Sequence, residues 1–276
     1  MLDNFIFENH LGLRFVGLDH GVYMNYNGLR DYSWSYEAIN SKISRFYRPV
    51  QSQKIPLVVY CTSDAEAISV KNRLHELAES DIVAKIPGKI YIGDYYVTGY
   101  ITGSVKSDYL VTKRLCKLSL SFVSDNWAWY REQKHIFLPG SNTGDGVAGG
   151  FDLPYDYPFD YVMNTVGKQI TIDAIRNSPF KITIYGEVDN PSIMIGDHTY
   201  AVNGRLRQGE TLLIDSLTKT IIFTDVNGRT ENWFDRRIRN SYIFESIPPG
   251  QPSITWNGSF GFDLTIIEER SEPRWT

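Results

Sequence analysis

Residues 140–161, in the middle of the chain, read GSNTGDGVAGGFDLPYDYPFDY. The first part of this stretch holds too many glycines to keep regular secondary structure. Its second part places an aromatic–acidic pair and a proline about every four residues, a spacing that neither a helix nor a buried strand can use. We therefore expect an extended strap at 151–161 that connects two compact, β-rich halves.

This stretch divides the chain into three expected parts. Residues 1–137 form an N-terminal domain, 138–150 a Gly-rich linker, and 151–276 a C-terminal domain. A chain of 276 residues is long enough for two domains that each bury a core of their own.

The composition predicts a folded, β-rich protein. Hydrophobic residues make up 42% and charged residues 22% of the chain, as in globular proteins. Aromatic residues reach 14%, which favours strands, and the net charge of −4 argues against a protein that grips nucleic acid. We see neither a secretory signal nor an apolar run of roughly 20 residues that would span a bilayer. Cys61 and Cys116 lie in strand-like runs, so we expect small buried side chains and folding in a reducing cytoplasm.

The N-terminal half combines strands with one helix. Ser63-Asp64-Ala65-Glu66 is a capping box, and the apolar residues that follow it recur at helical spacing. They are Ala67, Val70, Leu74, Leu77 and Ala78. We expect this helix to close at Ser80-Asp81, before Pro87-Gly88. The alternation of Leu118, Leu120 and Phe122 with polar residues predicts a half-buried strand.

The C-terminal half reads as short strands separated by turn signals, a pattern typical of an antiparallel sandwich. The expected strands include 169–175, 180–187, 192–195, 199–202, 211–215, 220–225, 229–233, 243–246, 253–256 and 262–268. The predicted fold class is therefore mainly β with one helix in the N-terminal domain.

No motif assembles a catalytic, cofactor or metal site. Gly144-x-Gly146-x-x-Gly149 matches the dinucleotide fingerprint, but it follows a loop and opens no helix, so we interpret it as linker. His75 lies four residues before Glu79, where a zinc-binding helix would need a second histidine.

Two groups of acidic residues do not complete a catalytic or metal site either. Glu187-Val188-Asp189 resembles part of a glycosidase motif, but Ser192 stands where the acid/base carboxylate is required. The aspartates of the strap do not have the spacing of a calcium loop, and polar decoration explains them. These are Asp152, Asp156 and Asp160.

Trp233 and Trp256 are the candidate binding residues, because tryptophan rings stack on sugars. Aromatic residues of a sandwich are more often part of its core, so the sugar-binding role is the alternative interpretation.

The order of several segments resembles the distal tail protein of siphophages, the phage tail component that forms the hub between tail tube and tail tip. The segments are 4–9, 118–125 before Trp127 and Trp129, the strap 151–161, Asn190-Pro191-Ser192-Ile193, 209–216 and Ile247-Pro248-Pro249-Gly250. The likeness covers nearly the whole chain, and the order of the segments carries it.

The resemblance implies a structural virion protein without catalytic residues or cofactors. In that family the N-terminal domain is a ring-forming belt that closes a homohexamer around a DNA-conducting channel, and the C-terminal domain is a galectin-like β-sandwich. Implied partners are further copies of the chain, in a single ring or in back-to-back rings, the tail tube protein, a tail-associated lysin or tip hub protein, and a receptor-binding protein. DNA would pass without specific binding, so we expect a neutral or acidic pore surface. The implied location is the tail tip of the virion, after assembly in the bacterial host cytoplasm.

The sequence leaves two other functions open. The C-terminal sandwich could bind cell-surface glycans through Trp233 or Trp256, although the galectin sugar signature is missing from the sequence. A cell-wall hydrolase is the third interpretation, and the missing metal and carboxylate motifs argue against it.

Overall fold

The computed structural model describes residues 4–24, 29–107, 114–140 and 166–275. The Gly-rich linker beyond residue 140, the strap 151–161 and its three aspartates lie outside the described residues. The chain forms two compact units: unit 1 comprises Met1–Arg131 and Glu269–Thr276, and unit 2 comprises Glu132–Glu268.

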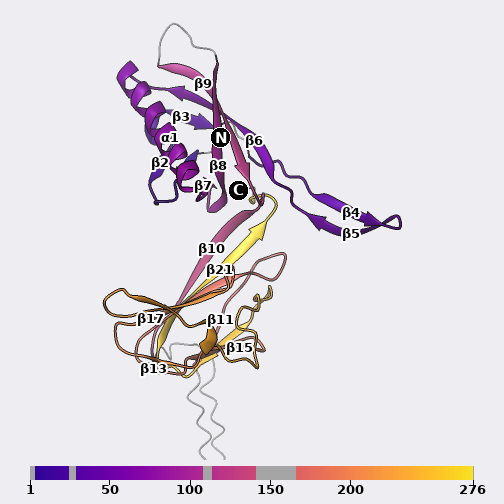
Figure 1. The fold of residues 1–276 in the computed structure, drawn as a ribbon, viewed down its shortest axis with the longest axis vertical. Helices are drawn as coiled ribbons and strands as arrows, with labels where there is room; N and C mark the ends of the chain where they lie inside the picture. The colour runs from indigo at the N-terminus through magenta and orange to yellow at the C-terminus, as the bar shows by residue number, and fades with distance from the viewer. Residues whose placement is uncertain (1–3, 25–28, 108–113, 141–165, 276) are drawn as a thin grey trace, which may run out of the picture. The chain divides into compact units, whose positions relative to one another are not determined.

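Unit 1 is an antiparallel sheet with one long helix. Its elements are β1 (Ile6–Glu8), β2 (Arg14–Val16), η1 (Leu18–His20), β3 (Val22–Met24), β4 (Ser35–Ile39), β5 (Lys42–Tyr47), β6 (Gln51–Tyr60), α1 (Asp64–Ala84), β7 (Gly88–Ile92), β8 (Tyr95–Ser107), β9 (Leu115–Ser124) and β10 (Trp129–Phe137). The hydrogen-bonded order is β3-β6-β9-β8-β7-β1-β2, and β10 pairs with β8 at Tyr130 and Tyr96. Among the residues that the structure describes, strands β4 and β5 pair only with each other, and they extend away from this sheet (Figure 1).

The helix α1 begins where the sequence predicts and ends later. Ser63 is its N-cap, and the Ser63 hydroxyl accepts a hydrogen bond from the Glu66 backbone at 3.2 Å. The predicted apolar stripe is buried against the sheet, together with Asp81. The helix continues to Ala84 and ends at Lys85, whose φ of 56° starts the left-handed turn before Pro87. Asp81 therefore lies inside the helix, and its carbonyl accepts a hydrogen bond from the Lys85 backbone N–H.

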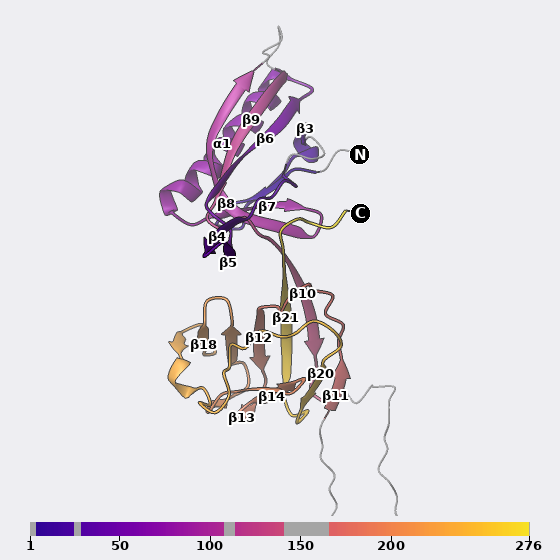
Figure 2. The ribbon, with the colours of Figure 1, turned by 90° about the vertical axis from the view of Figure 1, so that its right-hand side faces the viewer.

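Unit 2 is a sandwich of two antiparallel sheets, as the strand spacing predicts. Its elements are β11 (Val166–Gln169), β12 (Phe180–Tyr185), β13 (Val188–Asp189), β14 (Ser192–Ile195), β15 (His198–Ala201), β16 (Arg205–Leu206), β17 (Thr211–Asp215), β18 (Thr220–Thr224), β19 (Thr230–Asn232), η2 (Phe234–Arg236), β20 (Ser253–Trp256) and β21 (Gly261–Arg270). One layer has the order β19-β18-β17-β12-β21, and the other β11-β20-β14-β15. Figure 2 labels β18, β12 and β21 of the first layer and β11, β20 and β14 of the second. Ile182 of β12, Ile193 of β14 and Ile254 of β20 belong to the same buried core.

Two expected strands of unit 2 are not regular strands. Beyond Gln169 the chain keeps only an isolated bridge between Ile172 and Gly250, and 243–246 forms a turn. The partner segment 248–252 contains three prolines, which lack the N–H groups that a continuous ladder needs.

The division into units differs from the boundaries expected from the sequence. The glycine-rich stretch suggested a boundary at residue 137, whereas the units divide within β10, at Arg131. Phe137 at the end of β10 stacks on Phe262 in the unit 2 core, with ring centroids 4.5 Å apart. The last residues of the chain, from Glu269, return to unit 1, because Arg30 and Arg48 bind them there.

The helices within the described residues are too short or too polar to cross a lipid bilayer.

Candidate assembly surfaces

The hairpin β4–β5 exposes large apolar side chains on both of its strands. Asn40 and Ser41 join its strands and have φ values of 50° and 64°, as a two-residue hairpin turn with positive φ requires. Four large apolar side chains are more than half exposed: Tyr36 (63%), Ile39 (66%), Ile43 (54%) and Phe46 (60%). An isolated two-stranded hairpin is marginally stable in water. The hairpin therefore presents side chains that a partner surface would bury.

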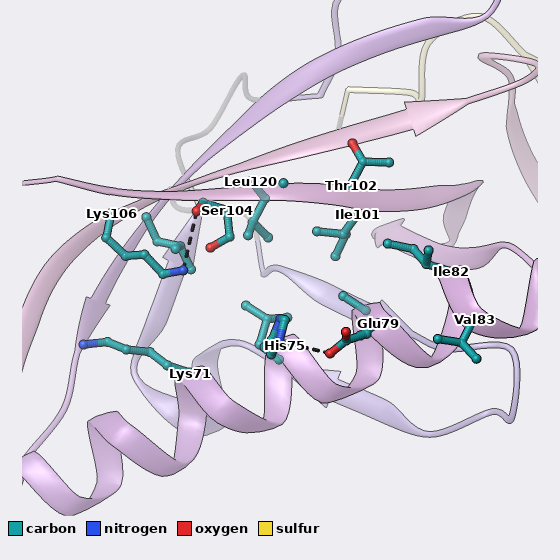
Figure 3. A pocket seen from close by; sticks show the side chains of 14 residues that line it. Lys71, His75, Glu79, Ile82, Val83, Ile101, Thr102, Ser104, Lys106 and Leu120 are labelled. Atoms are coloured by element: carbon teal, nitrogen blue, oxygen red, sulfur yellow. Dashed lines mark hydrogen bonds and ion pairs between the residues drawn. The ribbon is translucent and has the colours of Figure 1, made fainter.

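A groove between α1 and β8 is a second apolar surface (Figure 3). It encloses about 370 Å³, and Ile82, Val83 and Ile101 contribute apolar walls. Ile82 and Val83 are exposed on the side of α1 that borders the groove. Lys71 and Lys106 add positive charge at one end of it (Figure 3).

The helix pair that resembles part of a zinc motif lies on the wall of this groove. His75 Nε2 is 3.1 Å from Glu79 Oε2, and both side chains are largely exposed. The described residues contain no group of three or more His, Cys, Asp or Glu side chains arranged to hold a metal ion. The contact is a surface pair between neighbouring turns of a helix.

A third exposed region lies on the sheet itself. Val58 and Tyr60 of β6 and Lys117 of β9 line a shallow hollow of about 690 Å³. Its floor includes Met24 and Leu57, which belong to the buried core. Unit 1 thus has three distinct apolar surface regions among the described residues.

The buried polar contacts of unit 1 are structural. The Asp81 carboxylate is fully buried; its Oδ1 accepts a hydrogen bond from the His10 backbone at 2.8 Å and lies 2.7 Å from His10 Nδ1. Asn9 donates to the Ser80 hydroxyl at 3.1 Å. These contacts fasten the β1–β2 turn to the last turns of α1. The sequence gives no local signal for them, because residues 9–10 and 80–81 are far apart in the chain.

The acidic motif of unit 2 has a structural partner. Arg205 Nη2 of β16 lies 2.9 Å from Oε1 of Glu187, which directly precedes β13. Arg205 Nε lies 3.5 Å from Asp189 Oδ1 on the paired strand β13, so both carboxylates form ion pairs with the guanidinium. The guanidinium accounts for both carboxylates without a catalytic role. Ser192, at the start of β14, is exposed.

The two candidate sugar-binding residues are in the core of unit 2. Trp233 and Trp256 are each 3% exposed. Trp233 lies between the ring of Phe223, whose centroid is 4.5 Å away, and the guanidinium of Arg236 at 4.2 Å. Trp256 donates its indole N–H to the carbonyl of Phe260 at 3.1 Å. Neither ring has a free face on which a sugar could stack, so the structure favours the core interpretation of both residues.

Both cysteines are buried and unpaired, as expected from their strand positions. Burial raises the pKa of the Cys61 thiol, which keeps it in the unreactive protonated form.

Solved structures with the same fold include a phage hub protein and chains of a phage baseplate. The Dit protein of phage SPP1, described as a paradigm of the hub adsorption apparatus in phages that infect Gram-positive bacteria, matches with a TM-score of 0.57 and 10% identity, over 96% of this chain and 99% of that chain. A chain of the phage P2 baseplate in its activated conformation matches with a TM-score of 0.60 in the calcium form and 0.59 in the strontium form. Each has 12% identity and covers 99% of this chain and 100% of that chain.

No protein-family model matches this chain, and no curated protein matches its sequence. At these identities the likeness establishes the fold. The chain has the β-rich, two-domain fold of phage hub proteins. The resemblance found in the sequence is therefore confirmed for the fold.

Proposed function

We propose that this chain is a structural component of a phage tail tip: a distal tail hub that forms a hexameric ring between the tail tube and the tip or baseplate. The likeness to hub and baseplate proteins over nearly the full length of both chains carries the proposal. The sequence resemblance, which rests on the order of segments along the chain, supports it independently.

The exposed surfaces of unit 1 fit this role. A ring requires a heterologous interface, in which one face of a subunit binds a different face of its neighbour. We propose that the hairpin β4–β5 supplies one of these faces, because it carries four exposed apolar side chains on strands that pair only with each other. Unit 2 would be the galectin-like domain that anchors tip or receptor-binding proteins.

The proposed ring conducts DNA without binding it. A basic lining would hold the phosphate backbone and resist its passage. The net charge of −4 supports a neutral or acidic pore surface. In this role the chain acts in the virion, after assembly in the host cytoplasm, and it has no enzymatic activity.

Native mass spectrometry of the purified protein tests the proposal. We expect a species of six copies of the 31.6 kDa chain, or twelve if two rings stack back to back. The same protein mixed with the tail tube protein of its phage should form a complex in which both are present. A protein that stays monomeric alone and with the tube protein would contradict the proposal.

A further inference from the structure

Both ends of the hairpin β4–β5 are bound to the C-terminal segment of the chain. Trp34 directly precedes β4, and Arg48 directly follows β5. The Ser271 hydroxyl accepts a hydrogen bond from Trp34 Nε1 at 3.1 Å and another from Arg48 Nη2 at 3.2 Å. A hydroxyl oxygen has two lone pairs, so it can accept both. One side chain of the C-terminal segment therefore joins the two ends of the hairpin.

The guanidinium of Arg48 strengthens this junction. Arg48 Nη1 donates to the carboxylate of Glu269, and the guanidinium carbon lies 4.3 Å from the centre of the Trp34 ring. The Arg48 side chain is only 5% exposed. Charge-assisted hydrogen bonds from a planar guanidinium fix both distance and direction, and the loss of one partner would leave a charge shielded from water.

The C-terminal segment continues along the residues that lead into the hairpin. Arg30 is nearly buried, and its Nη1 donates to the carbonyl of Pro273 at 3.1 Å and to that of Arg274 at 3.4 Å. The Arg30 guanidinium carbon lies 4.2 Å from the centre of the Trp275 ring. The contacts thus extend over most of the segment that follows β21.

Residues outside the C-terminal segment also contact this end of the hairpin. The side-chain amides of Gln51 and Gln53 in β6 donate to the carbonyls of Ser33 and Asp31, and so hold the lead-in to β4. On the return side, Arg48 also donates to the Asn126 side chain, at a long 3.5 Å. On the return side, Glu269 and Ser271 thus supply the closer contacts to the Arg48 guanidinium.

We propose that residues 269–275, which we call the C-terminal clamp, are a positioning element that fixes the direction of the hairpin β4–β5 relative to the body of unit 1. This role rests on the proposed function. In the proposed ring the hairpin enters the contact between copies, and a fixed direction places it there. The strands of the hairpin pair only with each other, so their direction is set where they join the sheet. Without the clamp, the hairpin samples a wider range of directions.

Electron–electron spin distances within unit 1 test the clamp directly. One label is attached through Lys42→Cys in β5 and one through Glu76→Cys on the exposed side of α1. Both native cysteines are buried, so labelling is selective. An excess of unlabelled protein suppresses distances between copies. We expect a narrow distribution in the parent, and one at least about twofold broader in a chain that ends at Arg270.

Arg48→Lys is the second variant, since it keeps the charge but loses the planar fork that binds Glu269 and Ser271 together. Its matched control is Arg45→Lys on β5, an exposed arginine whose ring contact is within the hairpin. We expect broadening for Arg48→Lys and the parental width for Arg45→Lys. Arg48→Lys changes one side chain and removes no segment, so it still tests the clamp if the shortened chain does not fold.

The outcomes separate the clamp from the proposed function. The clamp is overturned if the distance distributions of Arg48→Lys and of a folded truncated chain are as narrow as that of the parent, with circular dichroism and thermal midpoint unchanged. This holds whether or not rings form. Broadening in these variants supports the clamp even if the parent never assembles, in which case the proposed ring fails alone.

Discussion

The exposed side chains of the hairpin allow a quantitative prediction about assembly. The perturbation replaces Tyr36, Ile39, Ile43 and Phe46 with threonine, alone and together. Threonine favours strands, so the hairpin keeps its backbone preference while the apolar surface is lost.

The magnitude follows from the exposed fractions. Complete burial of a large apolar side chain contributes about 1.5–3 kcal/mol. The four side chains are between 54% and 66% exposed, so that part of their surface is still available for burial. Each would then add about 1–2 kcal/mol to a contact between copies, and the four together about 4–7 kcal/mol. Ordering at the interface offsets part of this energy, so we expect the quadruple variant to weaken association at least about a hundredfold.

Sedimentation velocity over a range of protein concentrations is the assay. The concentration at which the assembled species appears should rise in the quadruple variant, and by about tenfold in each single variant. Ile175→Thr is the matched control, because Ile175 is 74% exposed but belongs to unit 2. If the quadruple variant assembles like the parent while its far-ultraviolet spectrum is unchanged, the hairpin is not an assembly surface.

Three further predictions concern stability. Ser63→Ala removes the acceptor for the Glu66 backbone N–H and should lower the free energy of unfolding by about 1 kcal/mol in chemical denaturation. Trp233→Ala should lower it by about 3–5 kcal/mol, because the ring is buried, whereas a sugar-binding role would predict loss of glycan binding at unchanged stability. Burial keeps the pKa of His135 below its ordinary value, so the unfolded chain binds this proton more readily. Stability is therefore lost as pH falls through about 6.5, the pKa of an unfolded histidine. Between about pH 7.5 and 5.5, the thermal midpoint of His135→Gln should fall by less than that of the parent. Equal falls in the two proteins would contradict this.

Local patterns along the chain predict much of the fold. The capping box at Ser63 and the apolar spacing after it locate α1, because both signals lie within a few residues of each other. The alternation at 117–122 identifies β9, since one face of that strand is buried and the other is not. Most short strands of unit 2 follow from turn residues between β-branched runs, and the antiparallel sandwich follows from their density.

The features that depend on distant partners are not predictable in this way. The hairpin β4–β5 has exposed apolar residues on strands without a buried face, so it lacks the alternation that marks a sheet strand; only Asn40-Ser41 signals its turn. The return of residues 269–276 to unit 1 depends on Arg30 and Arg48, more than two hundred residues earlier in the chain. For Trp233 and Trp256, residue type alone does not distinguish a core ring from a binding ring, and burial does.

Electron microscopy of the purified protein, alone and with the tail tube protein, shows whether the chain forms a ring. We expect annular particles with sixfold symmetry and a central channel, in which the hairpin of each subunit contacts the next. Particles of single chains under every condition, or a closed assembly in which the hairpin faces solvent, would contradict it.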